Sequence, residues 1–165
     1  MSAPALPAAI TTQRLALPLW DAATVTALRE GGRLDHWHPE FPRREDVDAA
    51  GLWREGDPWG PRSVVSLRTG AVMGSVGFFG PPEPAADDVP EVEVGFGLVP
   101  TARGHGAMTE ALAALLPLAD AAGVRVPARV RPENRVALRL LTVRGFTDVR
   151  ASGDDDTLVL VRPRG

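Results

Sequence analysis

Two groups of residues in the middle of the chain have types and spacing that could do chemistry. Glu91 and Glu93 alternate with valines, so both carboxylates lie on one face of an extended segment. Such a carboxylate can accept a proton from a reacting group, directly or through a water molecule. Soon after follows the turn of residues 100–108, which holds two glycines and Arg103. On spacing alone, solvent-facing strand residues are the simpler interpretation of the two glutamates.

The turn lies where an extended pattern changes into a helical one. Residues 91–99 read as a strand, and the apolar residues between Ala111 and Leu116 recur with helical spacing. A helix begins with unpaired N–H groups and a partial positive charge, and glycines before it allow close approach and φ > 0. The unit can therefore cradle an anion, most often a phosphate, and Arg103 adds a planar charged donor. A plain strand–helix turn is the alternative interpretation.

Two common phosphate loops are excluded by the residues themselves. The Walker loop requires a lysine, and the chain has none. The dinucleotide fingerprint requires a third glycine where this chain has Thr109.

Three blocks in the same order resemble the GNAT superfamily of N-acetyltransferases. Its acyl-CoA loop, Arg/Gln-x-x-Gly-x-Gly/Ala, is matched by Arg103, Gly106 and, less well, Met108. The wider run 93–112 looks like the branch that acetylates ribosomal-protein N-termini. Residues 131–146 resemble that branch's Pro-x-Asn-x-x-Ser…Leu…Gly-Phe segment, and residues 12–17 look like its first strand. The resemblance spans nearly the whole chain.

The resemblance implies a fold and a reaction. We expect one α+β domain over residues 1–165, with a mostly antiparallel sheet of about seven strands and about four helices. In this fold the fourth and fifth strands splay apart, and the opening accepts the pantetheine arm of acetyl-CoA. The implied reaction is acetyl transfer to an amine of a protein, peptide or small molecule, with Glu93 as the base and Glu91 as the second choice.

The resemblance also implies which residues bind. Contacts to acetyl-CoA are expected from Phe96, Leu98, Val99, Arg103, Gly104, His105, Gly106, Ala107, Met108, Thr109 and Asn134. Asn134 has a second, compatible interpretation as a helix N-cap. The wall of the acceptor pocket is expected to include Trp37, His38, Phe41 and Trp59, with Trp53 as a further candidate. The alternative is that the aromatic residues belong to the core and the histidines to the surface.

The chain departs from the family at the group that protonates the leaving thiolate. It has no tyrosine, and Leu141 stands where many members carry one. Ala137 stands where the ribosomal branch has serine. A coenzyme A thiolate is a fair leaving group by itself, with a thiol pKa of about 8–9 by analogy with cysteine. Water can therefore serve as the acid, and Thr142 and His38 are weaker alternatives.

Composition narrows the function classes. The chain has 165 residues and no cysteine, which excludes disulfides and thiolate metal sites. Its net charge of −3 gives no indication of a basic face that would bind nucleic acid. No metal site is expected, and no stretch reaches the length of a membrane span. We expect a cytoplasmic protein. A homodimer is common in this branch, and an exposed hairpin edge is a suitable interface.

Elements that position these residues follow from the pattern. In chain order we expect a loose tail (1–9), a strand (10–19), two helices (22–29 and 45–54), a hairpin (62–80), the central strand and helix (91–122), a strand (125–131), a helix (135–144) and a last hairpin (147–162). Pro117 should kink or end its helix, and Pro127 should leave one side of its strand unpaired.

Three functions remain open on these observations. The first is an N-acetyltransferase acting on a protein, peptide or small-molecule amine. The second is an acyl-CoA-binding module with weak or no catalysis, which the missing tyrosine and serine favour. The third is an enzyme that modifies antibiotics or metabolites by the same chemistry.

Overall fold

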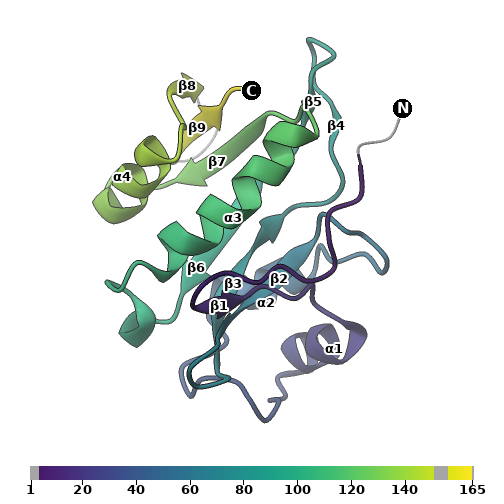
Figure 1. The fold of residues 1–165 in the computed structure, drawn as a ribbon, viewed down its shortest axis with the longest axis vertical. Coiled ribbons are helices and arrows are strands. Elements are labelled where there is room, and N and C mark those ends of the chain that lie inside the picture. The colour runs from purple at the N-terminus through teal and green to yellow at the C-terminus, as the bar shows by residue number, and fades with distance from the viewer. Residues whose placement is uncertain (1–3, 151–155, 165) are drawn as a thin grey trace.

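The strands form two antiparallel half-sheets that diverge from one another. A computed structural model describes residues 4–150 and 156–164 (Figure 1). The four-stranded half has the order β1 (Leu15–Ala16), β2 (Pro61–Ser66), β3 (Val72–Phe78), β6 (Val94–Leu98). The three-stranded half has the order β7 (Val126–Val130), β9 (Leu158–Arg162), β8 (Asp148–Arg150), and a short ladder joins β4 (Glu83–Pro84) to β5 (Pro90–Glu91).

The expected splay lies between β6 and β7, the fourth and fifth strands of the main sheet. Both are edge strands of their half-sheets. Among the described residues, backbone hydrogen bonds join the two halves just before these strands, where Arg125 N donates to Pro90 O and Val92 N donates to Arg125 O. Pro127 lies on β7, so the prediction that one side of this strand is unpaired is confirmed. The predicted α+β fold with its splayed sheet is likewise confirmed.

Helices cover both faces of the sheet. In residues 4–150 and 156–164 the α-helices are α1 (Ala22–Glu30), α2 (Arg44–Ala50), α3 (Ala107–Ala121) and α4 (Arg135–Val143), and a 3-10 turn, η1 (Pro100–Ala102), precedes α3. In Figure 1, α3 crosses in front of the sheet, and α1 and α2 lie on the opposite side from it. Among the described residues no helix is both long and apolar enough to cross a membrane.

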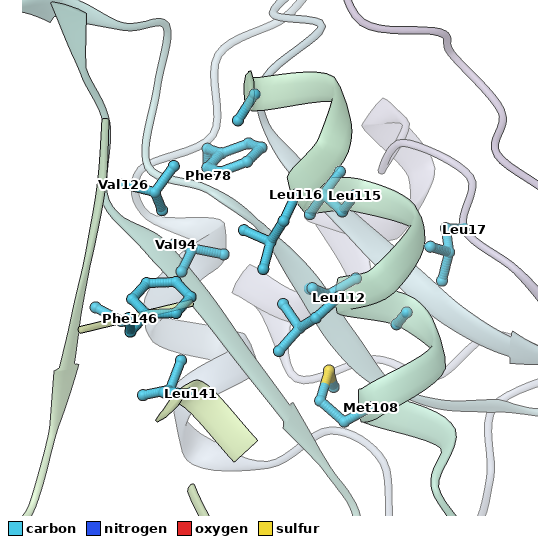
Figure 2. Close-up of a cluster of buried hydrophobic side chains, with 14 of the residues drawn as sticks. Leu17, Phe78, Val94, Met108, Leu112, Leu115, Leu116, Val126, Leu141 and Phe146 are labelled. Carbon is cyan, nitrogen blue, oxygen red and sulfur yellow. The ribbon is translucent and has the colours of Figure 1, made fainter. Parts of the chain in front are cut away.

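Alternation along β6 divides the core into two clusters. Val94 and Leu98 point toward α3 and pack in the larger cluster with Leu112 and Leu116, which Figure 2 shows in part. Val99 points the other way, into a smaller cluster beneath α1 and α2. The odd-numbered residues of β6 therefore share the face on which α2 lies.

Two expectations about local structure are wrong. The N-terminal tail is not loose from residue 4 onward, because Leu6 is buried and Arg62, itself fully buried, donates to the carbonyls of Pro7 and Leu17. The helix α3 also continues through Pro117, so the alternative in which this proline ends the helix is wrong. Its exposed position, one turn after the exposed Ala113, leaves the unpaired carbonyl in water at little cost.

Candidate functional site

The edge of β6 that faces β7 carries backbone groups without partners. Val99 N donates to Met73 O at 2.8 Å, which shows that the odd-numbered residues of β6 bond to β3. Because the direction of the hydrogen bonds alternates along a strand, the N–H groups of Phe96 and Leu98 point toward β7. Within the described residues neither has an acceptor. An extended ligand can add to this edge as a further strand does.

The loop between β6 and α3 presents a second set of free amides. Gly104 and Gly106 have φ of +83° and +78°, in the left-handed region that glycine enters without steric cost. Gly106 is the N-cap of α3, and no side chain caps this end. In the part of the chain that the structure describes, the N–H groups of residues 104–109 have no acceptor. Free amides and a helix dipole at one point suit the oxygens of a diphosphate.

Side chains hold the loop without occupying its amides. Arg14 Nη1 donates to His105 O at 2.9 Å, while Arg14 Nε pairs with Glu110 Oε1 at 2.6 Å. Arg103 Nε donates to Leu98 O at 3.0 Å, so this side chain folds onto the end of β6. Its two Nη groups make no hydrogen bond within residues 4–150 and 156–164. Arg103 therefore still has donors available beside the loop.

A cleft of about 470 Å³ passes through the gap between the half-sheets. On one face it is lined by α2, and on the other by Asn134 and the start of α4. It brings together three of the predicted site residues, namely Glu93, Phe96 and Asn134.

Other predicted binding residues lie outside this cleft. Leu98, Val99 and Met108 are buried. Among the described residues the N–H groups of Leu98 and Met108 are still free for a ligand, whereas Val99 donates to Met73 O and accepts from Ala102 N, so its predicted contact is corrected. Thr109 is exposed on the first turn of α3. His38 lines a separate cavity of about 530 Å³, behind the loop, together with His105 and Ala107.

Glu93 lies at the junction of the cleft with a further cavity of about 400 Å³. Its Oε1 accepts from Arg129 Nε, on β7, at 3.2 Å. Burial raises the pKa of Glu93 above the ordinary carboxyl value, and the charge of Arg129 opposes that rise only in part. A carboxylate of raised pKa beside open space is a better proton acceptor than an ordinary surface glutamate.

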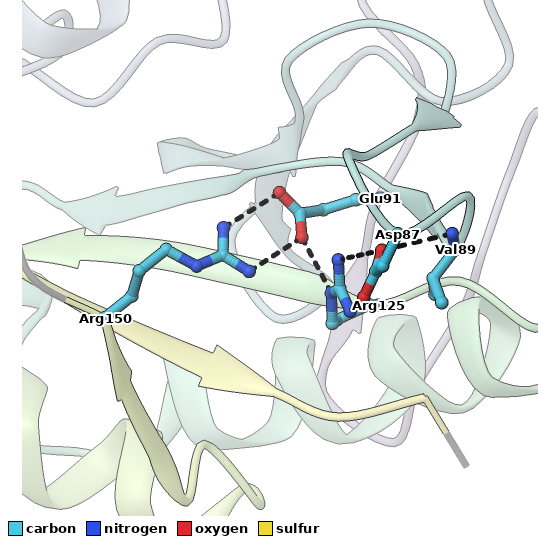
Figure 3. Close-up of polar contacts among 5 residues, drawn as sticks. All are labelled: Asp87, Val89, Glu91, Arg125 and Arg150. Carbon is cyan, nitrogen blue, oxygen red and sulfur yellow. Dashed lines mark hydrogen bonds and ion pairs between the residues drawn. The ribbon is translucent and has the colours of Figure 1, made fainter.

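Glu91 is unsuited to the same role, although it lies on the same face. Figure 3 shows both of its oxygens in contact with Arg150, and one of them also with Arg125. These partners lower the pKa of Glu91, with the Arg150 hydrogen bonds as the largest cause. Arg125 is in turn bound by Asp87. The cluster ties the segment before β6 to β8, which makes it a structural clamp.

The aromatic residues expected at the acceptor wall belong to the core. Trp37 and Phe41 pack against each other beneath α1 and α2, with ring centroids 4.9 Å apart, and Phe41 is fully buried. Trp59 packs on Phe78 in the larger core. None of the three lines the cavities described above. Burying their large apolar rings in the core stabilises the fold more than exposing them in a hydrated pocket would. The prediction that these three residues line the acceptor pocket is therefore corrected.

Other residues line the cleft that were not among the predicted site residues. They are Arg43, just before α2, Leu52, just after it, Phe79 after β3, and Arg129 from β7. A signal was present in Gly95 and Gly97, which lie on the same face as Glu93. A Cβ at Gly95 would fall 2.4 Å from the Phe79 ring, and one at Gly97 would fall 2.0 Å from Arg43 Nη1. Alternate glycines on one strand face indicate side chains that lie across it.

The end of the cleft beside α4 has no side-chain acid at the two positions where the sequence departs from the family. Ala137 lines it without a hydroxyl, and Leu141 is fully buried. Thr142 donates its hydroxyl to Leu138 O at 2.8 Å. Asn134 Oδ1 accepts from Ala137 N at 3.1 Å, which confirms the N-cap and leaves the amide NH₂ group for other contacts. Within the described residues no group of three or more histidine or acidic side chains could hold a metal ion.

Comparison with known proteins agrees with this geometry. Residues 14–147 match the family model of the acetyltransferase (GNAT) domain. Similar solved structures include an acetyltransferase from Agrobacterium tumefaciens strain C58, with 22% identity over 96% of this chain and 95% of that one, at a TM-score of 0.64. A ribosomal-protein-S5-alanine acetyltransferase from Vibrio fischeri shares 13% identity over 96% and 97%, at a TM-score of 0.62. A GNAT-family acetyltransferase from Bacillus anthracis shares 16% over 93% and 95%, at a TM-score of 0.59. No curated protein matches the chain.

Proposed function

Because the chain belongs to the GNAT acetyltransferase family, we propose that it moves the acetyl group of acetyl-CoA to a primary amine by direct attack in a ternary complex. One observation carries the proposal. The free N–H groups of Phe96 and Leu98 continue into the free amides of residues 104–109, and Glu93, just before the same strand, lines the cleft beside Phe96. The family uses acetyl-CoA, and these donors suit its arm and its diphosphate.

Acetyl-CoA supplies a thioester, and the backbone of this chain holds it. The Phe96 and Leu98 N–H groups bind the pantetheine arm in the manner of an added strand. The amides of Gly104–Met108 and the dipole of α3 bind the diphosphate, with Arg103 as a further charged donor. The positive φ of Gly104 and Gly106 aims these amides outward. N–H groups of β6 near Phe96 also stabilise the oxyanion that forms on the thioester carbonyl.

Glu93 accepts the proton of the attacking amine, directly or through a water molecule. Amines are mostly protonated at neutral pH, so a base must remove a proton before or during attack. The nitrogen forms a bond to the acetyl carbon, the carbon–sulfur bond breaks, and the electron pair leaves on sulfur. Ala137 and Leu141 provide no acid, so water protonates the thiolate.

The acceptor is either a peptide N-terminus or a small-molecule amine. The ribosomal-protein-S5-alanine acetyltransferase among the similar structures supports the first kind, at the level of the fold. The missing hydroxyls at Ala137 and Leu141 favour a second candidate, an acyl-CoA-binding module with weak catalysis.

Thiol release from acetyl-CoA tests both candidates. Because the chain has no cysteine, a thiol-reactive dye reports only the coenzyme A that is released. We expect release with at least one member of a panel of amines and peptides, and a rate roughly 10²- to 10⁴-fold lower in Glu93→Gln. The matched control is Glu30→Gln, at an exposed glutamate at the end of α1.

The outcomes separate the candidates. Absence of release with every amine, while calorimetry detects bound coenzyme A, would select the binding module. Release that is unchanged in Glu93→Gln would remove Glu93 as the base.

A further inference from the structure

Arg43 lies flat on the strand that carries the proposed base. It precedes α2 and lines the cleft, and its guanidinium rests on the backbone of Gly97 in β6. A Cβ at Gly97 would fall 2.0 Å from Nη1, 2.4 Å from Cζ and 2.7 Å from Nη2, so only glycine leaves room for the group. Gly97 and Glu93 lie on the same face of the segment, which places Arg43 on the acceptor side.

The backbone N–H of Arg43 and one edge of its guanidinium are hydrogen-bonded to Asp46. Asp46, which is completely buried, accepts from Arg43 N at 2.8 Å, Nε at 3.1 Å and Nη2 at 2.8 Å. The hydroxyl of Ser75, across from Gly97 on β3, donates to the same carboxylate. These bonds fix the orientation of the guanidinium before any ligand binds, which lowers the entropy that binding must lose.

The other side of Arg43 presents donors to the cleft. Nη1 makes no hydrogen bond within the described residues, and its one ion pair there, with the exposed Glu45, is long at 4.0 Å. Asp46 lies below and is inaccessible, so the part of Arg43 that a ligand can reach offers N–H groups, beside the exposed carboxylates of Glu45 and Asp48 that also line the cleft. A guanidinium with fixed, free donors is the side chain best suited to a carboxylate.

We propose that Arg43 is a specificity-determining residue that binds a carboxylate of the acceptor, so that the preferred acceptors carry an amine and a carboxylate on one short chain. This inference rests on the proposed function. The strand rise places Gly97 about 13 Å from Glu93. If the two side-chain groups are separated as their strand positions are, hydrogen bonds of about 3 Å at each end leave about 7 Å between amine and carboxylate. Two extended residues span that distance, whereas a single α-amino acid is too short.

The experiment uses acceptors that differ only in charge. Thiol release is measured with dialanine, with its C-terminal amide and with free alanine, in the presence of saturating acetyl-CoA. A charge-assisted hydrogen bond should lower the KM of dialanine at least about tenfold relative to the amide, with a smaller effect on kcat. Alanine should be the poorest of the three because its two groups cannot reach both sites.

Two glycine variants report on Arg43 without removing its charge. Gly97→Ala drives a methyl group into the guanidinium, and the ratio of KM between amide and acid should fall to about one. The matched control is Gly95→Ala, whose Cβ meets the Phe79 ring instead, and this variant should keep the preference for the acid.

A double variant covers the case in which displaced Arg43 unfolds the protein. Arg43→Met combined with Asp46→Asn removes both charges, so no unpaired charge is buried, and it too should lose the preference for the acid. Equal KM for acid and amide in the wild type, or a preference that survives in both altered proteins, would overturn the role of Arg43 and leave the acetyltransferase proposal standing. If no amine in the wider panel releases thiol, both proposals fail together.

Discussion

Replacing Gly104 with alanine tests the loop that is proposed to bind the diphosphate. Gly104 has φ of +83°, and a Cβ there would meet nothing within 4 Å, so the only penalty is conformational. An L-residue in the left-handed region costs roughly 1–2 kcal/mol. The free loop can relax toward negative φ, since the amides of residues 104–109 have no partners in the described chain. Binding must then restore the strained conformation.

The conformational cost of Gly104→Ala lowers the affinity for coenzyme A by the same free energy. At 1.4 kcal/mol for each factor of ten, a cost of 1–2 kcal/mol weakens coenzyme A binding by about 5- to 30-fold. The matched control is Gly70→Ala, in the β2–β3 turn, where φ is +75° and a Cβ again meets nothing within 4 Å. The control carries the same strain at a distance from the loop, so its affinity should equal that of the wild type.

Titration calorimetry with coenzyme A at constant salt concentration measures both variants, and thermal melts confirm that both are folded. The reasoning is refuted if Gly104→Ala binds as tightly as Gly70→Ala. It is equally refuted if both variants weaken binding to the same extent, because the effect would then come from global strain.

Four further predictions concern single residues. Burial raises the pKa of Glu93, so the stability linked to this group is present at low pH and is lost as pH rises through the raised pKa. Glu93→Gln should therefore have a higher melting temperature than the wild type at pH 8 and the same melting temperature at pH 4. Its rate of thiol release should lack the fall at acidic pH that the wild type shows. Asn134→Ala should lose about 1 kcal/mol of unfolding free energy with the N-cap, whereas Asn134→Asp should not, as denaturant titrations would show. Ala137→Ser should raise kcat in the thiol-release assay by supplying an acid for the thiolate; an unchanged kcat would mean that this proton transfer is not limiting. The hydrogen bonds from Arg125 lower the pKa of Asp87 to about 2, so the contribution of Asp87 is present above pH 4 and lost toward pH 2; Asp87→Asn should lower the melting temperature at pH 6 and leave it unchanged near pH 2.

Sequence periodicity located most elements because each buries one face. The predicted α1 ends at Gly31, and α4 is capped by Asn134 as its residue type indicates. The central strand and helix were recognisable because their period changes at the glycine-rich turn. The prediction that Pro117 interrupts α3 failed because the cost of a proline depends on whether the freed carbonyl reaches water, which is a tertiary property.

The candidate site divides in the same way. The positive φ of Gly104 and Gly106 was predictable, since a turn that brings a backbone close to a ligand uses glycine for this purpose. The buried positions of Trp37 and Trp59 were not, because an aromatic residue in a loop suits a pocket and a core equally well until its neighbours are known.

The sequence by itself determined the family and located the glycine-rich turn and the carboxylates before it, because all three depend on residue types at short spacing. Only the tertiary structure decided which carboxylate is clamped by arginines and which side chains line the cleft. Glu91 and Glu93 lie on the same face of the segment, yet Arg125, just before β7, and Arg150 of β8 clamp the first and leave the second half-buried beside open space. Arg43 reaches the cleft from a segment more than fifty residues away, and its place is set by a glycine that only the folded chain brings beneath it.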